Sequence, residues 1–289
     1  MIRETSSIGV DRRRASVGAR TWLRLSIAAA VLAFIGSVIG LTVHGIYGSL
    51  TPTFLFQALA QDIVNTVVVT PLMVLCAVMA LRGSYRAYVV WLGAVAFTVY
   101  SYVIYTFSVP FGPVFPLWVA VLGLSLYALI GGLASIDIPR TAEHFTNDRA
   151  VTVGAWTLVV VAGMFALLWL SEDVPALLTG VRPQSVVEMA LPTNPVHVLD
   201  YAIFLPAALG VGIRQLQRQA FAYPITAAFL VFLLLTCMPI LITPFVQTAL
   251  HEPAAWGIMI PIGIVAAVIL GILSWLLATV RTLTVSPEI

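Results

Sequence analysis

The sequence has very little charge and no lysine. Only 9% of its residues are charged, and all fourteen basic residues are arginine. The absence of lysine excludes a retinal-type Schiff base and any lysine nucleophile. A chain with 61% hydrophobic residues and a mean hydropathy of +1.04 lies outside the composition of water-soluble domains. The composition therefore indicates an integral membrane protein, and the lipid bilayer is its first expected partner.

Cysteine is also scarce, and the common catalytic motifs are missing. Cys76 and Cys237 each fall deep in an apolar run, so we interpret both as small core residues. The chain has no Walker loop, HExxH helix, GxSxG elbow or GxGxxG motif after a strand. We therefore assign no catalytic residue and no cofactor, and the sequence favours a role other than that of an enzyme.

Apolar runs of about 20 residues, each able to cross about 30 Å of hydrocarbon, recur along nearly the whole chain. The sequence predicts an all-α, polytopic transmembrane helix bundle with about eight spans. The predicted spans are 24–46, 61–81, 87–108, 115–136, 150–171, 195–215, 222–249 and 256–280. The seventh contains Pro239 and Pro244, which remove backbone hydrogen bonds, so we expect it to be bent.

The arginines predict the orientation, because basic residues in short loops stay on the cytoplasmic side. With the N-terminus inside, thirteen arginines are cytoplasmic and only Arg182 is outside. Both termini are then cytoplasmic. The predicted parts are a basic tail at 1–23, a transmembrane domain at 24–281 and a short tail at 282–289. The basic tail indicates contact with anionic lipid and no nucleic-acid partner.

An internal repeat is predicted from an offset of 135 residues, which aligns the halves 24–149 and 150–281 without gaps. The offset pairs Asp62 with His197, Asn65 with Asp200, Pro71 with Pro206, Tyr88 with Tyr223 and Phe97 with Phe232. Each half then has a polar pair at the outer end of a span, followed by a proline. Because four spans separate equivalent elements, the sequence predicts a parallel four-plus-four repeat about an axis along the membrane normal.

The polar pairs supply the candidate ligand site. Residues three apart share a helix face, so we expect Asp62, Asn65, His197 and Asp200 to converge in one outward-opening pocket. His197 and Asp200 are expected to form an imidazolium–carboxylate pair. Alternatively, His197 belongs to the solvated first turn of a helix that begins at Asn194. The position of Asp62 can likewise be explained by the positive end of its helix dipole.

Further polar residues lie near the same end. His44 closes the first span, and Tyr102 lies on a polar face of the third, so both are candidate ligands. We assign Tyr105 to an interfacial aromatic belt. Loop 171–195 is expected to hold a short interfacial helix over the pocket, and 51–62 is its counterpart.

Imidazole and carboxylate groups would suit a divalent ion held by His44, Asp62, His197 and Asp200. We nevertheless assign no metal site. The first span of the chain is too long for a signal-peptide core, so we expect it to be retained.

Two segments resemble known proteins. They are RGSYRAYVVWLGAVAFTVYSYVIYTFSVPFGPVFPLWVAVLGLSLYALI, residues 82–130, and LPTNPVHVLDYAIFLPAALGVG, residues 191–212. Both are similar to parts of bacterial multi-pass membrane proteins of uncharacterised activity. The resemblance implies the fold class and no activity. Together with the absence of lysine, which is typical of GC-rich bacterial genomes, it predicts location in the bacterial cytoplasmic (inner) membrane.

Three functional hypotheses follow. The first is a transporter or permease for a proton, an ion or a small polar solute, with the four polar residues as its binding site. The second is a membrane-embedded enzyme that acts on a lipid or quinone at the outer leaflet, with His197 as general base and Asp200 orienting it. The third is a non-catalytic subunit or sensor. Nothing in the sequence indicates an oligomeric state.

Overall fold

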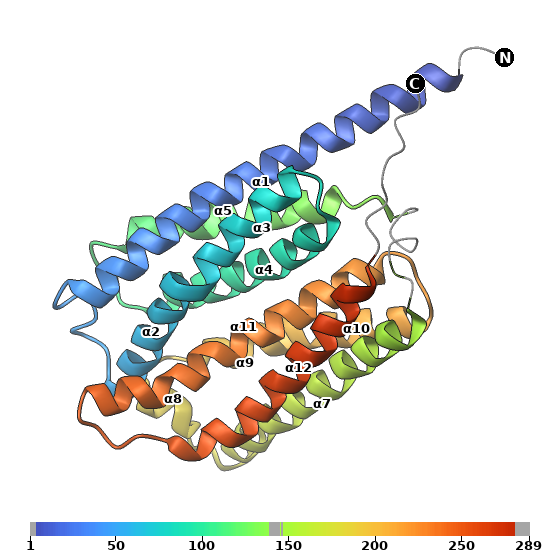
Figure 1. Ribbon diagram of the computed structural model, residues 1–289. Coiled ribbons are helices and arrows are strands. Elements are labelled where there is room, and N and C mark those ends of the chain that lie inside the picture. The colour runs from blue at the N-terminus through green and yellow to red at the C-terminus, as the bar shows by residue number, and fades with distance from the viewer. Residues whose placement is uncertain (1–3, 139–144, 146, 281–289) are drawn as a thin grey trace.

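The computed structural model describes the backbone of residues 4–138, 145 and 147–280, with side chains from Ala19 onward. This part of the chain is all-α, and eight of its helices are long and apolar enough to cross a membrane (Figure 1). The predicted class, a multi-pass helical membrane protein, is confirmed. Residues 282–289, the predicted C-terminal tail, lie outside the described residues.

The helices follow one another with short connections. They are α1 (Glu4–Thr42), α2 (Pro52–Val64), α3 (Thr70–Leu81), α4 (Tyr85–Ser108), α5 (Phe115–Ala134), α7 (Asp148–Thr179), α8 (Gln184–Glu188), α9 (Pro195–Leu199), α10 (Leu205–Leu216), α11 (Ala222–Ala249) and α12 (Met259–Thr279). A 3₁₀ turn, Trp256–Ile258, precedes α12. The π-helical segment Asn65–Val69 joins α2 to α3, and Asp200–Phe204 joins α9 to α10. Each of these two pairs of helices therefore forms a single membrane span.

Three spans differ from their predicted bounds. The helix of the first span begins at Glu4, so its backbone includes most of the predicted N-terminal tail. The second begins at Pro52 because the Thr51 hydroxyl caps it and proline is favoured at the first position. The segment expected as an interfacial helix before this span is thus part of the span. The fifth continues through the expected loop to Thr179, where Gly180 ends it in the left-handed conformation.

The spans form two four-helix bundles that lie side by side in Figure 1. In the N-terminal bundle, α1 and α4 each pack against α3 and α5. In the C-terminal bundle, α7 and α11 each pack against α10 and α12. The bundles meet where α11 packs along α4 and α2. The order of packing is therefore the same in the two bundles.

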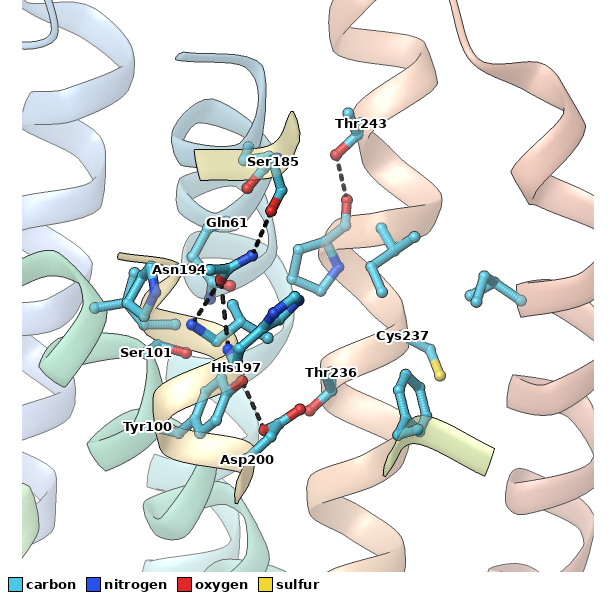
Figure 2. Close-up of a pocket in the computed structure, with 18 of the residues that line it drawn as sticks. Gln61, Tyr100, Ser101, Ser185, Asn194, His197, Asp200, Thr236, Cys237 and Thr243 are labelled. Atoms are coloured by element: carbon cyan, nitrogen blue, oxygen red, sulfur yellow. Dashed lines mark hydrogen bonds between the residues drawn. The ribbon is translucent and has the colours of Figure 1, made fainter. Parts of the chain in front are cut away.

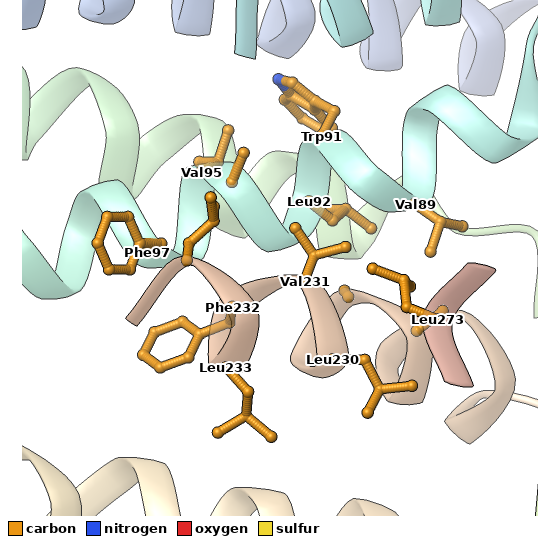
Figure 3. Close-up of a cluster of buried hydrophobic side chains, with 14 of the residues drawn as sticks. Val89, Trp91, Leu92, Val95, Phe97, Leu230, Val231, Phe232, Leu233 and Leu273 are labelled. Atoms are coloured by element: carbon orange, nitrogen blue, oxygen red, sulfur yellow. The ribbon is translucent and has the colours of Figure 1, made fainter. Parts of the chain in front are cut away.

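The seam between α4 and α11 is tightly packed. Figure 3 shows side chains of the two helices interleaved, among them Val231, Phe97 and Phe232, and the rings of the last two lie edge to face with centroids 6.0 Å apart. A methyl group on Gly93 would lie 2.4 Å from the carbonyl oxygen of Ala228. Only glycine permits this approach of the two backbones.

The two π segments have the same local construction. The Thr70 N–H donates to the carbonyl of Asn65, and the Leu205 N–H donates to the carbonyl of Asp200. A proline, Pro71 or Pro206, follows as the second residue of the next α-helix. Proline has no N–H and its ring crowds the preceding turn, so a wider turn directly before it accommodates the ring. In contrast, α11 continues without a break through its two internal prolines.

Candidate functional site

A cavity of about 450 Å³ opens between the bundles, toward the end of the molecule at which α1 ends and α2 begins. Its wall is mainly aliphatic and aromatic, with rings from α2, α4, α7 and α11. Polar side chains of the wall on the side of α8 and α9 include Gln61, Ser185, Asn194, His197 and Asp200 (Figure 2), and Glu172 is also among the lining residues. Ser101, Thr236 and Thr243 add hydroxyl groups elsewhere on the wall, which is otherwise mainly apolar. No lysine or arginine lines it among the described residues.

Asp200 is held at the cavity wall by two aromatic side chains. Its Oδ1 accepts a hydrogen bond from the Tyr100 hydroxyl at 3.1 Å, drawn in Figure 2, and its Oδ2 accepts one from Trp169 Nε1 at 2.7 Å. Tyr100 belongs to α4, so this bond joins the two bundles. Asp200 is 6% exposed, and neither of these two hydrogen bonds comes from a basic residue. Sequence reasoning missed both aromatic donors.

His197 bonds to a different acid from the one that we expected. Its Nδ1 lies 3.0 Å from Oδ2 of Asp173, and its ring stacks on Trp169 with centroids 4.4 Å apart. Its Nε2 has no hydrogen bond within the described residues, and Oε2 of Glu172 lies 3.8 Å away. The predicted pair with Asp200 is therefore wrong. Because α7 continues where a loop was predicted, its last turns bring these acids to His197.

The start of the sixth span agrees with its prediction. Oδ1 of Asn194 accepts hydrogen bonds from the backbone N–H groups of Val196 and His197, and Pro195 occupies the first helical position. Nδ2 of Asn194 donates to the Ser185 hydroxyl at 3.1 Å. This bond ties α9 to α8, whose Ser185 lines the cavity. A short helix, α8, lies in the segment where an interfacial helix was predicted, and its Ser185 lines the cavity.

Asp62 lies in a separate, closed cluster in the N-terminal bundle. Its Oδ2 accepts from the Tyr47 hydroxyl at 2.7 Å, and its Oδ1 accepts from the Tyr105 hydroxyl at 2.8 Å. Burial, together with the adjacent carboxylate, raises the pKa of Tyr47 well above its usual range, so that hydroxyl keeps its proton. The assignment of Tyr105 to an interfacial belt was wrong, because its side chain is buried and bonded to Asp62.

Asn65 is also bonded within the N-terminal bundle. Its Nδ2 donates to the Ser37 hydroxyl at 3.3 Å, and its Oδ1 accepts from Gln61 Nε2 at 2.9 Å. His197 and Asp200 line the cavity, but Asp62 and Asn65 do not. The four residues therefore do not share one pocket. The third and seventh spans pack along the seam and occupy the space in which the second and sixth were expected to meet.

The remaining candidate ligands are not at the cavity. Tyr102 is buried, its hydroxyl donates to the Ala33 carbonyl at 3.4 Å, and its ring packs on Tyr105. His44 is exposed beyond the end of α1 and takes part in neither cluster. The metal-binding set that includes it does not assemble. In the described part of the chain, no three His, Cys, Asp or Glu side chains are placed to hold a metal ion.

The two cysteines are buried and unpaired, as expected for core residues. Cys237 lies on the apolar part of the cavity wall.

Comparison with known protein families, with curated proteins and with solved structures finds no match for this chain. The chemistry of the site therefore follows from its own geometry. An enclosed apolar wall favours hydrocarbon, and the carboxylates in that wall favour a cation or a hydrogen-bond donor. Aromatic rings beside those carboxylates add an attraction for cations.

Proposed function

We propose that this protein is a carrier for a small amphipathic organic cation, which binds in the cavity between the two bundles. The observation that carries the proposal is a mainly apolar cavity wall that contains two acids, Asp200 and Glu172, and no lysine or arginine among the described residues. The proposal narrows the hypothesis of a permease for a proton, an ion or a small polar solute, because an inorganic ion would gain no favourable contact from the apolar wall.

The cationic headgroup would lie beside Asp200. A carboxylate in a site of low dielectric attracts a positive charge far more strongly than it does in water. Trp169 and Tyr100, which both bond to Asp200, supply aromatic rings next to it. An anionic headgroup would meet Asp200 and Glu172 with no lysine or arginine among the described lining residues to offset them. The hydrocarbon part would follow the apolar wall, which includes Phe232.

Transport rather than binding alone is supported by the arrangement of the bundles. The shared packing order, the two π segments 135 residues apart, and the contacts of Gly93 with Ala228 and of Phe97 with Phe232 all fit a parallel four-plus-four repeat. A residue that touches its own equivalent lies near the axis that relates the two copies. We propose that the bundles move against each other at this seam.

The predicted orientation places both termini in the cytoplasm and the cavity mouth on the outer side. This orientation rests on the arginines, and location in a bacterial cytoplasmic membrane is part of the same proposal.

Binding is tested with a dodecyltrimethylammonium ion that carries bromine at the end of its chain. The protein is placed in lipid nanodiscs, and quenching of tryptophan fluorescence by bromine reports contact. We expect saturable quenching, which Trp169→Phe reduces. Asp200→Asn should weaken binding about tenfold, in line with the 1.4 kcal/mol that separates tenfold steps in affinity. Equal quenching by bromododecanoate, or no effect of either variant, would show partition into the bilayer and refute the proposal.

Transport is tested by joining the bundles. Phe97→Cys and Phe232→Cys are introduced together after Cys76 and Cys237 are changed to alanine. We expect oxidation to link the two helices and to stop uptake of dodecyltrimethylammonium into proteoliposomes, while its binding stays at the level of the same variant before oxidation. Each single-cysteine variant is the matched control. Unchanged uptake after complete cross-linking would exclude movement at the seam.

A second function is favoured by one contact, the bond from His197 Nδ1 to Asp173. A carboxylate on Nδ1 orients a histidine so that Nε2 can act as a general base. A membrane enzyme for a lipid or quinone would use this pair. Lipid extract incubated with the reconstituted protein should then change in its mass spectrum, and His197→Gln should prevent the change. An unchanged spectrum with the native protein would exclude this role.

A further inference from the structure

Asp62 is a buried acid that does not line the cavity. The residue is only 2% exposed and lies in a helix that is long and apolar enough to span a membrane. The titratable groups that face it are Tyr47 from the loop after α1, and Tyr105 and Tyr102 from α4. From α1 it meets Gly40, where an added methyl would lie 2.2 Å from Oδ2. No basic side chain in the described chain bonds to it.

The hydrogen bonds of this cluster can accommodate Asp62 with or without a proton. When the group is ionised, Tyr47 donates to Oδ2 and Tyr105 donates to Oδ1. The Tyr105 oxygen also lies 3.2 Å from the carbonyl oxygen of Ala58. A hydroxyl has one hydrogen, so it donates to one of these two acceptors at a time.

The alternative acceptor gives the protonated state its own set of bonds. A proton taken up from water forms an O–H bond at Oδ1 of Asp62, and this new O–H donates to the Tyr105 oxygen. The Tyr105 hydrogen turns to the Ala58 carbonyl, and the Tyr47 bond to Oδ2 is kept. No buried polar group loses a partner in the exchange. A lone buried carboxylate with two such arrangements is suited to take up and release a proton.

Tyr105 connects this cluster to the cavity. Tyr105, which carries the hydrogen that turns, and Ala58, one of its two acceptors, both belong to the cavity wall. Gln61, next to Asp62 in the chain, also lines the cavity and donates to Asn65. The wall therefore contains the residues whose hydrogen bonds depend on the charge of Asp62.

We propose that Asp62 is a second site in this protein, a proton-binding carboxyl group coupled through Tyr105 to the occupant of the cavity. The coupling part rests on the proposed carrier function. An amphipathic cation in the cavity favours ionised Asp62, because opposite charges attract across a medium of low dielectric. Binding of the cation then releases a proton, and protonation of Asp62 favours release of the cation. The linkage is reciprocal, as any coupling between two binding sites must be.

Infrared difference spectroscopy of the protein in lipid tests the proton site without any ligand. The stretch of a protonated carboxyl group should appear as the pH falls, and Asp62→Asn should remove it. Asp200→Asn is the matched control, because it removes a buried acid at the cavity wall and should leave the Asp62 band. Tyr105→Phe should shift the frequency and the pH midpoint of the band while the protein stays folded. If Asp62→Asn does not fold, the shift of the band in Tyr105→Phe tests the proton site instead, and an unchanged band would count against it.

The coupling is tested separately with the brominated dodecyltrimethylammonium ion, whose own charge does not change with pH. In the Asp200→Asn background its affinity should rise about fivefold or more as the pH is raised through the midpoint of the Asp62 band. Adding Asp62→Asn should abolish this rise. A band that is absent at all pH values, or that survives in Asp62→Asn, would overturn the proton site.

A band that responds to Na⁺ in place of K⁺ would identify a metal cation as the ligand and overturn the proposal. A normal band together with pH-independent binding would overturn the coupling alone. Absence of saturable quenching by the probe would instead refute the carrier function and leave the proton site standing.

Discussion

Phe97 and Phe232 lie edge to face at the seam between the bundles, with ring centroids 6.0 Å apart, although 135 residues separate them in the chain. The same offset separates Gly93 from Ala228, where a methyl on the glycine would lie 2.4 Å from the carbonyl oxygen. The two bundles therefore touch through two pairs of residues that are each separated by the offset of the predicted repeat. The cavity begins beside this contact, since both rings line it.

Gly93→Ala should destabilise the protein, because the new methyl group forces α4 away from α11. We expect a loss of about 1–3 kcal/mol in the free energy of unfolding, typical of overpacking. Gly123→Ala is the matched control, since nothing lies within 4 Å of its added methyl. Denaturation of both variants in one detergent measures the difference. Equal stability would contradict the close approach at the seam.

Ser26→Ala should leave a buried indole without its acceptor. Trp91 Nε1 donates to the Ser26 hydroxyl at 2.7 Å, and both residues are fully buried. An unsatisfied buried donor costs about 1–3 kcal/mol. Ser125→Ala is the control, because within the described chain that equally buried hydroxyl bonds to carbonyls of its own helix alone. A smaller melting shift for Ser26→Ala than for Ser125→Ala would count against the Trp91 bond.

Asn194→Ala should weaken the start of the sixth span. The side chain accepts from two backbone N–H groups and donates to Ser185, so its loss removes the cap and the tie to α8. We expect about 1 kcal/mol of lost stability and faster hydrogen exchange at Val196 and His197. Asn194→Ser keeps a capping oxygen and should recover most of the loss. Similar exchange in both variants would show that the cap contributes little.

Asp173→Ala should release the ring of His197, because Asp173 is the one hydrogen-bond partner of its Nδ1 among the described residues. With only four histidines in the chain, ¹⁵N-histidine labelling resolves its signals. We expect the His197 resonances to lose the ring-current shift from Trp169 and to broaden as the ring becomes mobile. Glu188→Ala removes an exposed acid whose side chain bonds to Gln184 and to no other described residue, and it serves as control. An unchanged His197 signal would show that Trp169 alone fixes the ring.

The sequence was sufficient to predict the spans and the start of the sixth, because both depend on local signals. Apolar runs mark spans whatever their neighbours, and Asn194 followed by Pro195 marks a helix start. The end of the fifth span could not be predicted in this way. Glu172, Asp173 and Pro175 are typical of a loop, but in the structure they continue α7 and supply the acids beside His197.

The hydrogen-bond partners of the polar residues depend on which helices pack against one another within and between the bundles. No local sequence pattern contains that information. A tyrosine such as Tyr105 near a span end usually belongs to the interface. Its position against Asp62 follows only when α4 is packed beside α2. The bonds of Trp169 and Tyr100 to Asp200 likewise join helices that are distant in the sequence.

The π segments that begin at Asn65 and Asp200 affect how these spans must be compared with other helices. Each wide turn accommodates one residue more than an α-helical turn, and one residue corresponds to a rotation of about 100°. The polar part of each span is therefore out of phase with its apolar part. A helical wheel drawn through the whole of either span assigns the faces on one side of the π segment incorrectly. Insertion or deletion of a single residue there would turn Asp62 or His197 to another face while the part of the span beyond the proline kept its contacts.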